Sequence, residues 1–115
     1  MPRRQWKLRI RHILDTIAKI RVYTAGMSLD TFSANDLVVD AVLRNFIVIG
    51  EATRYIPIHV TTVYPQIPWR LMQDMRNVVV HDYPNVSLQV VWETIQNDLP
   101  LLLEPLRHLL EEAEE

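Results

Sequence analysis

The segment Arg76-Asn77-Val78-Val79-Val80-His81-Asp82-Tyr83 places three chemically useful side chains close together, immediately before Pro84. The arginine carries a permanent charge that can stabilise a phosphate, and the histidine can transfer protons near neutral pH. Proline disfavours helix at the residue before it, so the segment is predicted to run from a helix end into a turn at Tyr83. An arginine and a histidine are sufficient to cleave RNA without a metal ion.

In such a cleavage the ribose 2′-OH attacks the adjacent phosphorus, which leaves a 2′,3′-cyclic phosphate and a 5′-hydroxyl. DNA is not cleaved in this way because it lacks the 2′-OH. His81 suits the proton transfers, a role worth about 10²–10⁴-fold in rate. Arg76 suits the charged phosphorane because its guanidinium can donate to two oxygens at once. We therefore interpret Arg76 and His81 as candidate catalytic residues, and Asn77 as a supporting residue whose amide positions the histidine or the phosphate.

The spacing of the two candidates is awkward for a site built from one chain. On a regular helix, Arg76 and His81 lie about 140° apart. They can converge through the reach of Arg76, through termination of the helix near His81, or across two copies in a dimer, and this spacing favours a composite site. The competing interpretation is an arginine paired with Asp74 or Asp82 and a histidine that stabilises the helix dipole.

Apolar periodicity predicts four long helices. The first covers about residues 4–25 and stops at Gly26, and the second covers about 36–56 and stops before Pro57. The third covers about 68–80 or slightly more, with Pro68 in its first position, and the fourth starts near Ser87 as N-cap. We expect an all-α, antiparallel, up-and-down four-helix bundle with a kinked C-terminal helix, formed by one domain that covers residues 1–115.

Shorter features complete this prediction. Residues 28–35 are expected to form a polar connector with a short helical turn around Phe32, and residues 58–67 a loop with one helical turn. Pro100 and Pro105 are expected to kink the fourth helix or divide it.

The second helix is apolar around most of its circumference, which predicts burial on several sides and packing of more than one chain. Its charged residues fall within an arc of about 80°; they are Asp40, Arg44, Glu51 and Arg54. One interpretation is a solvent-facing strip with an Asp40–Arg44 pair. The other is a charged wall that lines a cleft or crosses a dimer interface.

Composition limits the remaining classes of protein. Apolar residues make up 49% of the chain and no apolar run approaches the length of a membrane span, so we expect a cytoplasmic, globular protein without membrane contact. The absence of cysteine excludes disulfides and thiolate metal sites. Two helically spaced groups contain histidine and acids, but we interpret them as solvated surface and expect no metal and no cofactor; they are His12 with Asp15, and His108 with Glu104, Glu111 and Glu112.

Charge is unevenly distributed along the chain. Basic residues crowd the first helix, and acidic residues crowd the end; they are Arg3, Arg4, Lys7, Arg9, Arg11, Lys19 and Arg21, and Glu111, Glu112, Glu114 and Glu115. The basic end is interpreted either as a surface that contacts an RNA backbone, or as a solvated helix face or partner of the acidic tail.

The segment from Arg76 to Tyr83 resembles the Arg-x4-His-x-Tyr motif of the HEPN superfamily, and more closely its HepT-type toxin branch. Further blocks resemble that family in the same order: Asp40-Ala41-Val42-Leu43-Arg44-Asn45 with Ile49-Gly50-Glu51-Ala52, then Pro65-Gln66-Ile67-Pro68-Trp69 and Met75-Arg76-Asn77, then Trp92 and Asp98-Leu99-Pro100. The resemblance therefore spans nearly the whole chain. One departure is Ser87, which stands where relatives commonly carry an acid; loss of that acid could lower the rate.

The resemblance implies a metal-independent ribonuclease toxin of a type VII-like toxin–antitoxin pair, which acts on RNA, expected to be tRNA. It implies a homodimer or a larger hetero-oligomer with a minimal nucleotidyltransferase antitoxin, which attaches AMP to Tyr83. Asp40, Arg44 and Glu51 are then candidate supporting groups of the cleft. The alternatives are a Tyr83 ring that packs against the fourth helix, and a noncatalytic helical subunit that binds substrate or nucleotide for a nucleotidyltransferase complex.

Overall fold

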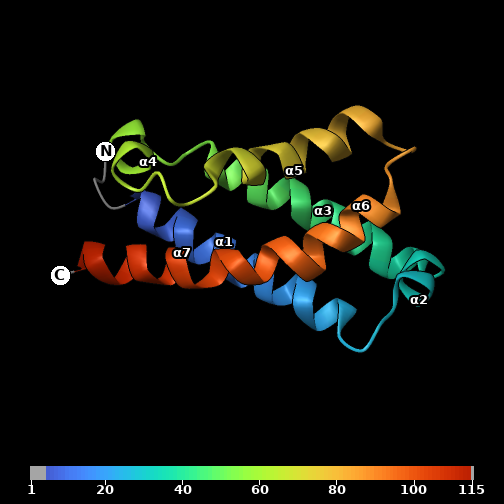
Figure 1. The fold of residues 1–115 in the computed structure, drawn as a ribbon. Coiled ribbons are helices and arrows are strands. Elements are labelled where there is room, and N and C mark those ends of the chain that lie inside the picture. Colours follow the sequence, from blue (N-terminus) through green and yellow to red (C-terminus); the bar gives the residue numbers. More distant parts are fainter. Residues whose placement is uncertain (1–4, 115) are drawn as a thin grey trace.

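The structure is a computed structural model that describes residues 5–114 of the chain, and the described residues form helices and connecting turns without a β-strand. Figure 1 shows that the long helical segments alternate in direction along the chain. The elements are α1 (Gln5–Thr24), α2 (Leu29–Ser33), α3 (Asp36–Thr53), α4 (Ile58–Val63), α5 (Trp69–Asp82), α6 (Leu88–Glu93), a π-helical turn η1 (Thr94–Asp98) and α7 (Leu99–Glu114). The predicted all-helical bundle is confirmed.

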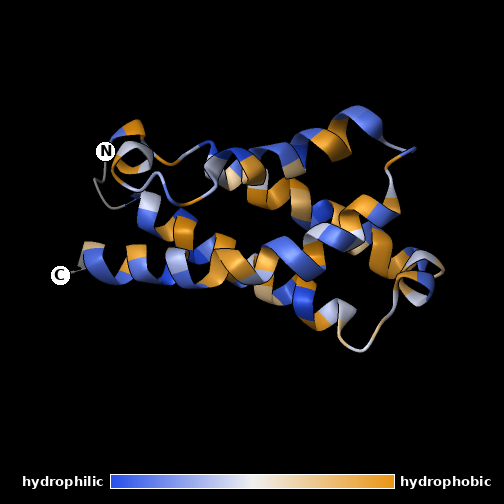
Figure 2. Ribbon diagram, viewed as in Figure 1, coloured by the Kyte–Doolittle hydropathy of each residue, from blue (hydrophilic) through white to orange (hydrophobic). Residues whose placement is uncertain are grey.

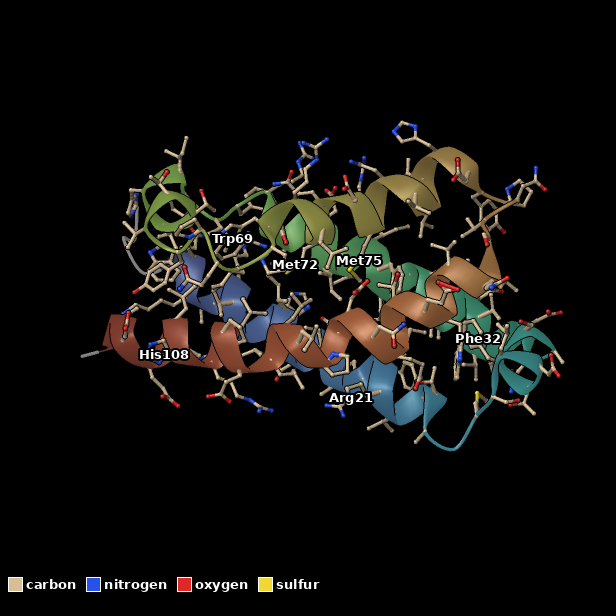
Figure 3. The ribbon with its side chains drawn as sticks, viewed as in Figure 1. Arg21, Phe32, Trp69, Met72, Met75 and His108 are labelled. Atoms are coloured by element: carbon tan, nitrogen blue, oxygen red, sulfur yellow. The ribbon has the colours of Figure 1, made fainter. Side chains whose placement is uncertain are left out.

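Helix α3 is the central element, because it packs against α1 on one side and α5 on the other. Half of its residues are buried, and Figure 2 shows many apolar residues along it. The side of α5 that faces the bundle carries Trp69, Met72 and Met75, which Figure 3 shows directed towards the other helices. The predicted burial of the second long helix on several sides is therefore confirmed, and it fixes α3 and α5 relative to each other.

Two predicted helix ends need correction. Helix α3 ends at Thr53 rather than near Ile56, because the next residues close tighter turns before Pro57: the N–H groups of Tyr55 and Ile56 donate to carbonyls three residues back, both at 3.1 Å. Pro68 is the N-cap of α5 and not its first helical residue, since its ψ of 71° lies outside the helical region. The predicted stop at Gly26 is confirmed, and its φ of +76° suits glycine.

The last long segment is divided by a π-helical turn rather than by a break at either proline. Pro100 has no N–H and its ring would crowd the carbonyl four residues earlier. The wider turn η1 precedes it, and there the Leu99 N–H donates to the carbonyl of Thr94, five residues back. Pro105 lies within α7, which continues through it.

The connecting elements close the ends of the bundle. Ser87 caps α6 as predicted, because its hydroxyl accepts from the Val90 N–H. The predicted turn around Phe32 is the short helix α2, whose buried phenylalanine lies 5.3 Å from the ring of Trp92. At the other end the Lys7 ammonium donates to the carbonyl of Ala113 at 2.6 Å, which ties α1 to the end of α7.

The residues expected to extend the two charged ends lie outside the described part of the chain or have no described side chain; they are Arg3, Arg4, Glu114 and Glu115. No described helix combines the length and the apolar character that crossing a membrane requires.

Candidate active site

Arg76 lies where α5 crosses α3 most closely, and Gly50 makes that approach possible. A Cβ built on Gly50 would overlap the Cβ of Arg76 and would lie 3.1 Å from the carbonyl oxygen of Met72. Any residue larger than glycine would therefore push the two helices apart at this point. Gly50 is buried and helical, so the benefit of glycine here is space rather than an unusual backbone angle.

Glu51 holds the Arg76 side chain against α3. The Arg76 Nε lies 3.0 Å from Glu51 Oε2, and 31% of the arginine side chain is exposed. The Nε–H is buried and does not point at the carboxylate well enough for a hydrogen bond, so the contact is electrostatic. Arg54 reaches both oxygens of the same carboxylate at 3.3 Å. Glu51 thus lies between two arginines that come from different helices.

The outer end of the Arg76 guanidinium is accessible for a ligand. Its Nη1 donates to Asn77 Oδ1 at 3.2 Å. Asn77 itself is exposed. A phosphate at this end would meet donors whose position is fixed by Glu51 on one side and by Asn77 on the other. The structure therefore brings together three of the predicted site residues, Arg76, Asn77 and Glu51.

His81 is not part of that cluster. Helix α5 continues through Asp82, so the helix does not end early enough to turn His81 towards Arg76, and the two residues remain about 140° apart. His81 is exposed and makes no polar contact with another described residue. One of the three routes by which the pair could converge is thus removed, and the reach of Arg76 and a second copy remain.

Tyr83 follows α5 and is 65% exposed, as expected, which contradicts packing of its ring against the fourth helix. Its side chain lines a groove of about 300 Å³ between α3 and α5. The charged residues Asp40 and Arg44 line this groove as well, and its remaining walls are apolar: Leu43, Ile47, Val79 and Val80. Asp40 and Arg44, two residues of the charged wall considered above, thus line a groove, and both are exposed, which also fits the solvent-facing strip.

The local ion pairs of the competing interpretations are absent from residues 5–113. Arg76 pairs with Glu51 instead of Asp74 or Asp82, and Asp74 lies 3.5 Å from Arg70 on its own helix. No ion pair joins Asp40 to Arg44. Both pairs belonged to the competing interpretations, which considered one helix alone, whereas packing of α3 on α5 offered Arg76 a partner from another element.

Histidine and acid also meet at the far end of α7. His108 Nε2 lies 2.9 Å from Glu112 Oε2, and the Tyr64 hydroxyl donates to Glu112 Oε1 at 2.6 Å. The tyrosine hydrogen bond lowers the pKa of Glu112, and the same bond to the carboxylate raises the pKa of Tyr64. Within the described residues, no three His, Cys, Asp or Glu side chains are grouped closely enough to hold a metal ion.

A cavity of about 420 Å³ lies at the opposite end of α1, between Gly26 and the π-helical turn, and contains none of the predicted site residues. Among the residues that shape the site around Arg76, sequence reasoning missed the role of Gly50. The available signal was that this chain has only two glycines, and one of them lies inside a strongly apolar helix.

An all-helical bundle whose third long helix carries the Arg-x4-His segment defines the class as HEPN-like. The family model described as "HepT-like: Ribonuclease HepT-like" matches residues 13–109, and the chain belongs to this family. The chain is 33% identical over 112 residues to "Gamma-glutamylcyclotransferase and putative RNase" of Methanocaldococcus jannaschii, which covers 97% of this chain but only 50% of that relative.

Two further relatives are matched over almost their full lengths. "Probable ribonuclease HepT" of Thermococcus cleftensis is 33% identical over 100 residues, covering 87% of this chain and 91% of the relative. A "Putative RNase" of Methanocaldococcus jannaschii is 32% identical over 115 residues, covering 100% of this chain and 99% of the relative. No solved structure matches the chain.

Proposed function

We propose that this protein is a metal-independent endoribonuclease toxin, which acts on tRNA as a cytoplasmic homodimer and is neutralised by a nucleotidyltransferase antitoxin. Membership of the HepT-like ribonuclease family supports the ribonuclease class. The observation that carries the proposal is the arginine pinned at the α3–α5 contact, with one end of its guanidinium fixed by Glu51 and the other accessible.

The proposed reaction uses two side chains. The 2′-OH attacks phosphorus as His81 takes its proton, and the P–O5′ bond breaks as the protonated His81 gives a proton to the leaving 5′-oxygen. His81 supplies the proton transfers. Arg76 stabilises the added negative charge on the phosphorane through its Nη donors. The products end in a 2′,3′-cyclic phosphate and a 5′-hydroxyl.

We place the complete site between two copies of the chain. Because α5 is regular from Arg76 to His81, one protomer presents the two groups in different directions. A two-fold axis beside α5 would bring the arginine of one copy towards the histidine of the other, since such interfaces join the same surface of both subunits. Exposed apolar residues on this part of the surface fit such an interface; they are Leu37 and Val80, at 82% and 44% exposure.

Tyr83 is the proposed site of neutralisation. Its phenol is exposed next to the groove that Arg44 and Asp40 line. AMP attached to this oxygen would add a phosphate and a nucleoside beside the end of α5, where they compete with RNA for space and for cations. Asp40 and Arg44 act in this proposal as supporting groups of the groove.

The test is cleavage of total tRNA by the purified protein in EDTA, with His81→Ala as the catalytic variant and His12→Ala as the matched control. His12 is an exposed histidine on α1, so its replacement removes the same imidazole group without changing α5. The proposal is supported if the wild type and His12→Ala cleave tRNA, if His81→Ala does not, and if the products carry cyclic phosphate ends. No cleavage by wild-type protein whose Tyr83 is unmodified by mass would favour the noncatalytic binding subunit.

A further inference from the structure

Two sets of contacts, joined by the adjacent residues Arg54 and Tyr55, lead from Arg76 on α5 past the end of α3 to Arg9 on α1. Arg76 pairs with Glu51, which also pairs with Arg54 at the end of α3. Tyr55 is the next residue, and the guanidinium carbon of Arg9, on α1, lies 4.4 Å above its ring centroid. We call Arg76, Arg54, Tyr55 and Arg9 the basic–aromatic strip. Its three arginines carry more charge than the adjoining carboxylate of Glu51.

The strip has the exposure that a ligand needs. The side chain of Arg54 is 62% exposed and Tyr55 is 59% exposed. The Tyr55 hydroxyl makes no hydrogen bond to another described residue, and Arg9 lies over the ring. A cation over one face of an exposed tyrosine does not require either group to be buried, and the rest of the ring stays accessible to solvent.

Cations interleaved with an exposed aromatic ring fit a single-stranded nucleic acid. The arginines attract the phosphates, while the ring stacks a base whatever its identity. A paired duplex fits poorly, because its bases are already stacked and cannot reach Tyr55. An acidic protein partner would bind to the arginines but would gain nothing from the exposed aromatic ring next to Arg9.

We propose that the basic–aromatic strip binds single-stranded RNA on one side of the scissile phosphate, with a base stacked on Tyr55 and phosphates paired with Arg54 and Arg9. This inference rests on the proposed function, since it takes Arg76 as the group at the scissile phosphate. It makes the substrate an unpaired segment, such as a loop or an end, instead of a helical stem. The strip is a binding surface and takes no part in bond breaking.

The experiment measures the affinity of a fluorescein-labelled oligouridylate by anisotropy, in the His81→Ala background so that RNA stays intact. Tyr55→Leu should weaken binding about 5- to 150-fold, the range of one lost base stack, and Tyr55→Phe should retain it. The matched control is Tyr23→Leu, an exposed tyrosine at the other end of α1, about 20 Å along the helix from Arg9. This control should bind as the parent does.

A second variant keeps the test independent of the aromatic ring. Arg54→Gln removes an exposed charge and should reduce the slope of log affinity against log salt by about 0.7, whereas Arg107→Gln, an exposed arginine on α7, should leave it unchanged. Folding of each variant is checked by thermal unfolding. The proposed binding surface would be contradicted if folded Tyr55→Leu bound with the parent's affinity, or if Arg54→Gln left the salt dependence of binding unchanged. Equal affinity for a paired duplex would contradict it as well.

Cleavage is measured separately with the wild-type background. If the strip variants bind RNA weakly but the wild type cleaves no RNA, the ribonuclease activity is refuted and the strip is still supported as a binding surface. If the wild type cleaves RNA and the strip variants bind and cleave it as well as the wild type does, only the proposed role of the strip is refuted.

Discussion

The backbone of Gly50 lies directly against the side chain of Arg76, so that a single added carbon on the glycine would overlap the arginine Cβ. The contact joins the centre of the bundle to the group proposed to hold phosphate. Neighbouring Glu51 then fixes the arginine's Nε from the same helix. Adjacent positions of α3 therefore set both how close α5 comes and how Arg76 points.

Gly50→Ala should move α5 at Arg76 as well as weaken the fold. Overpacking a close helix contact should lower the free energy of unfolding by about 1–3 kcal/mol, and cleavage by the molecules that remain folded should fall. Gly26→Ala is the comparison: its positive φ costs about 1–2 kcal/mol, but nothing lies within 4 Å of the added carbon. Denaturant unfolding gives both stabilities, and tRNA cleavage per folded molecule separates them. Equal activity of the two variants would contradict the role of the contact.

Glu51→Gln should reduce kcat more than it raises KM. The amide keeps the shape of the carboxylate but not its charge, so Arg76 loses the partner that orients it. Misplacement of a catalytic contact by about 1 Å can cost about 100-fold, and we expect a loss of about 10- to 100-fold. Asp74→Asn is the control, because Asp74 pairs with Arg70 rather than Arg76. A kcat equal to that of Asp74→Asn would show that Glu51 does not position the arginine.

Periodicity was sufficient to predict the four long helices, because the apolar faces of α1, α3, α5 and the last segment repeat at helical spacing. Cap chemistry predicted Ser87 and Gly26 for the same local reason. The π-helical turn before Pro100 was not predictable, since a proline near a helix start allows a kink, a break or a wider turn. Packing decided among these.

The candidate site was only partly predictable. The residue types in the segment from Arg76 to Tyr83 indicated the chemistry, and the exposure of Tyr83 followed from Pro84. The partner of Arg76 did not follow, because Glu51 is distant in sequence and nearer acids were available on α5. Such pairs depend on how one helix is rotated against another. Apolar periodicity predicts which face of a helix is buried, but it does not predict which residues of two helices come into contact.

Tyr64→Phe should raise the pKa of Glu112 towards its ordinary value of 4.5. The tyrosine hydroxyl stabilises the carboxylate, so their bond contributes stability above that pH and loses it as pH falls through the lowered pKa in the folded state. From the tyrosine's side, its contribution is lost as pH rises past its raised pKa, above 10.0. Titration of the Glu112 carboxyl carbon by NMR measures the change. Tyr55→Phe is the control, and a Glu112 pKa that is the same in Tyr64→Phe and this control would contradict the assignment.

Mixing two inactive variants should restore activity if Arg76 and His81 act across a dimer. In a heterodimer of Arg76→Ala with His81→Ala, one of the two sites receives an intact arginine from one chain and an intact histidine from the other. The isolated mixed dimer should therefore show about half of wild-type cleavage per dimer, whereas an unfractionated mixture with random pairing, in which half the dimers are mixed, should show about a quarter. Coexpression with different tags isolates the mixed dimer, and tRNA cleavage is measured on it. The control pairs the Arg76→Ala, His81→Ala double variant with wild type; its dimer has no complete composite site and should stay inactive. If the isolated heterodimer is also inactive, both groups must act within one chain, and Arg76 must reach around α5 to its own histidine.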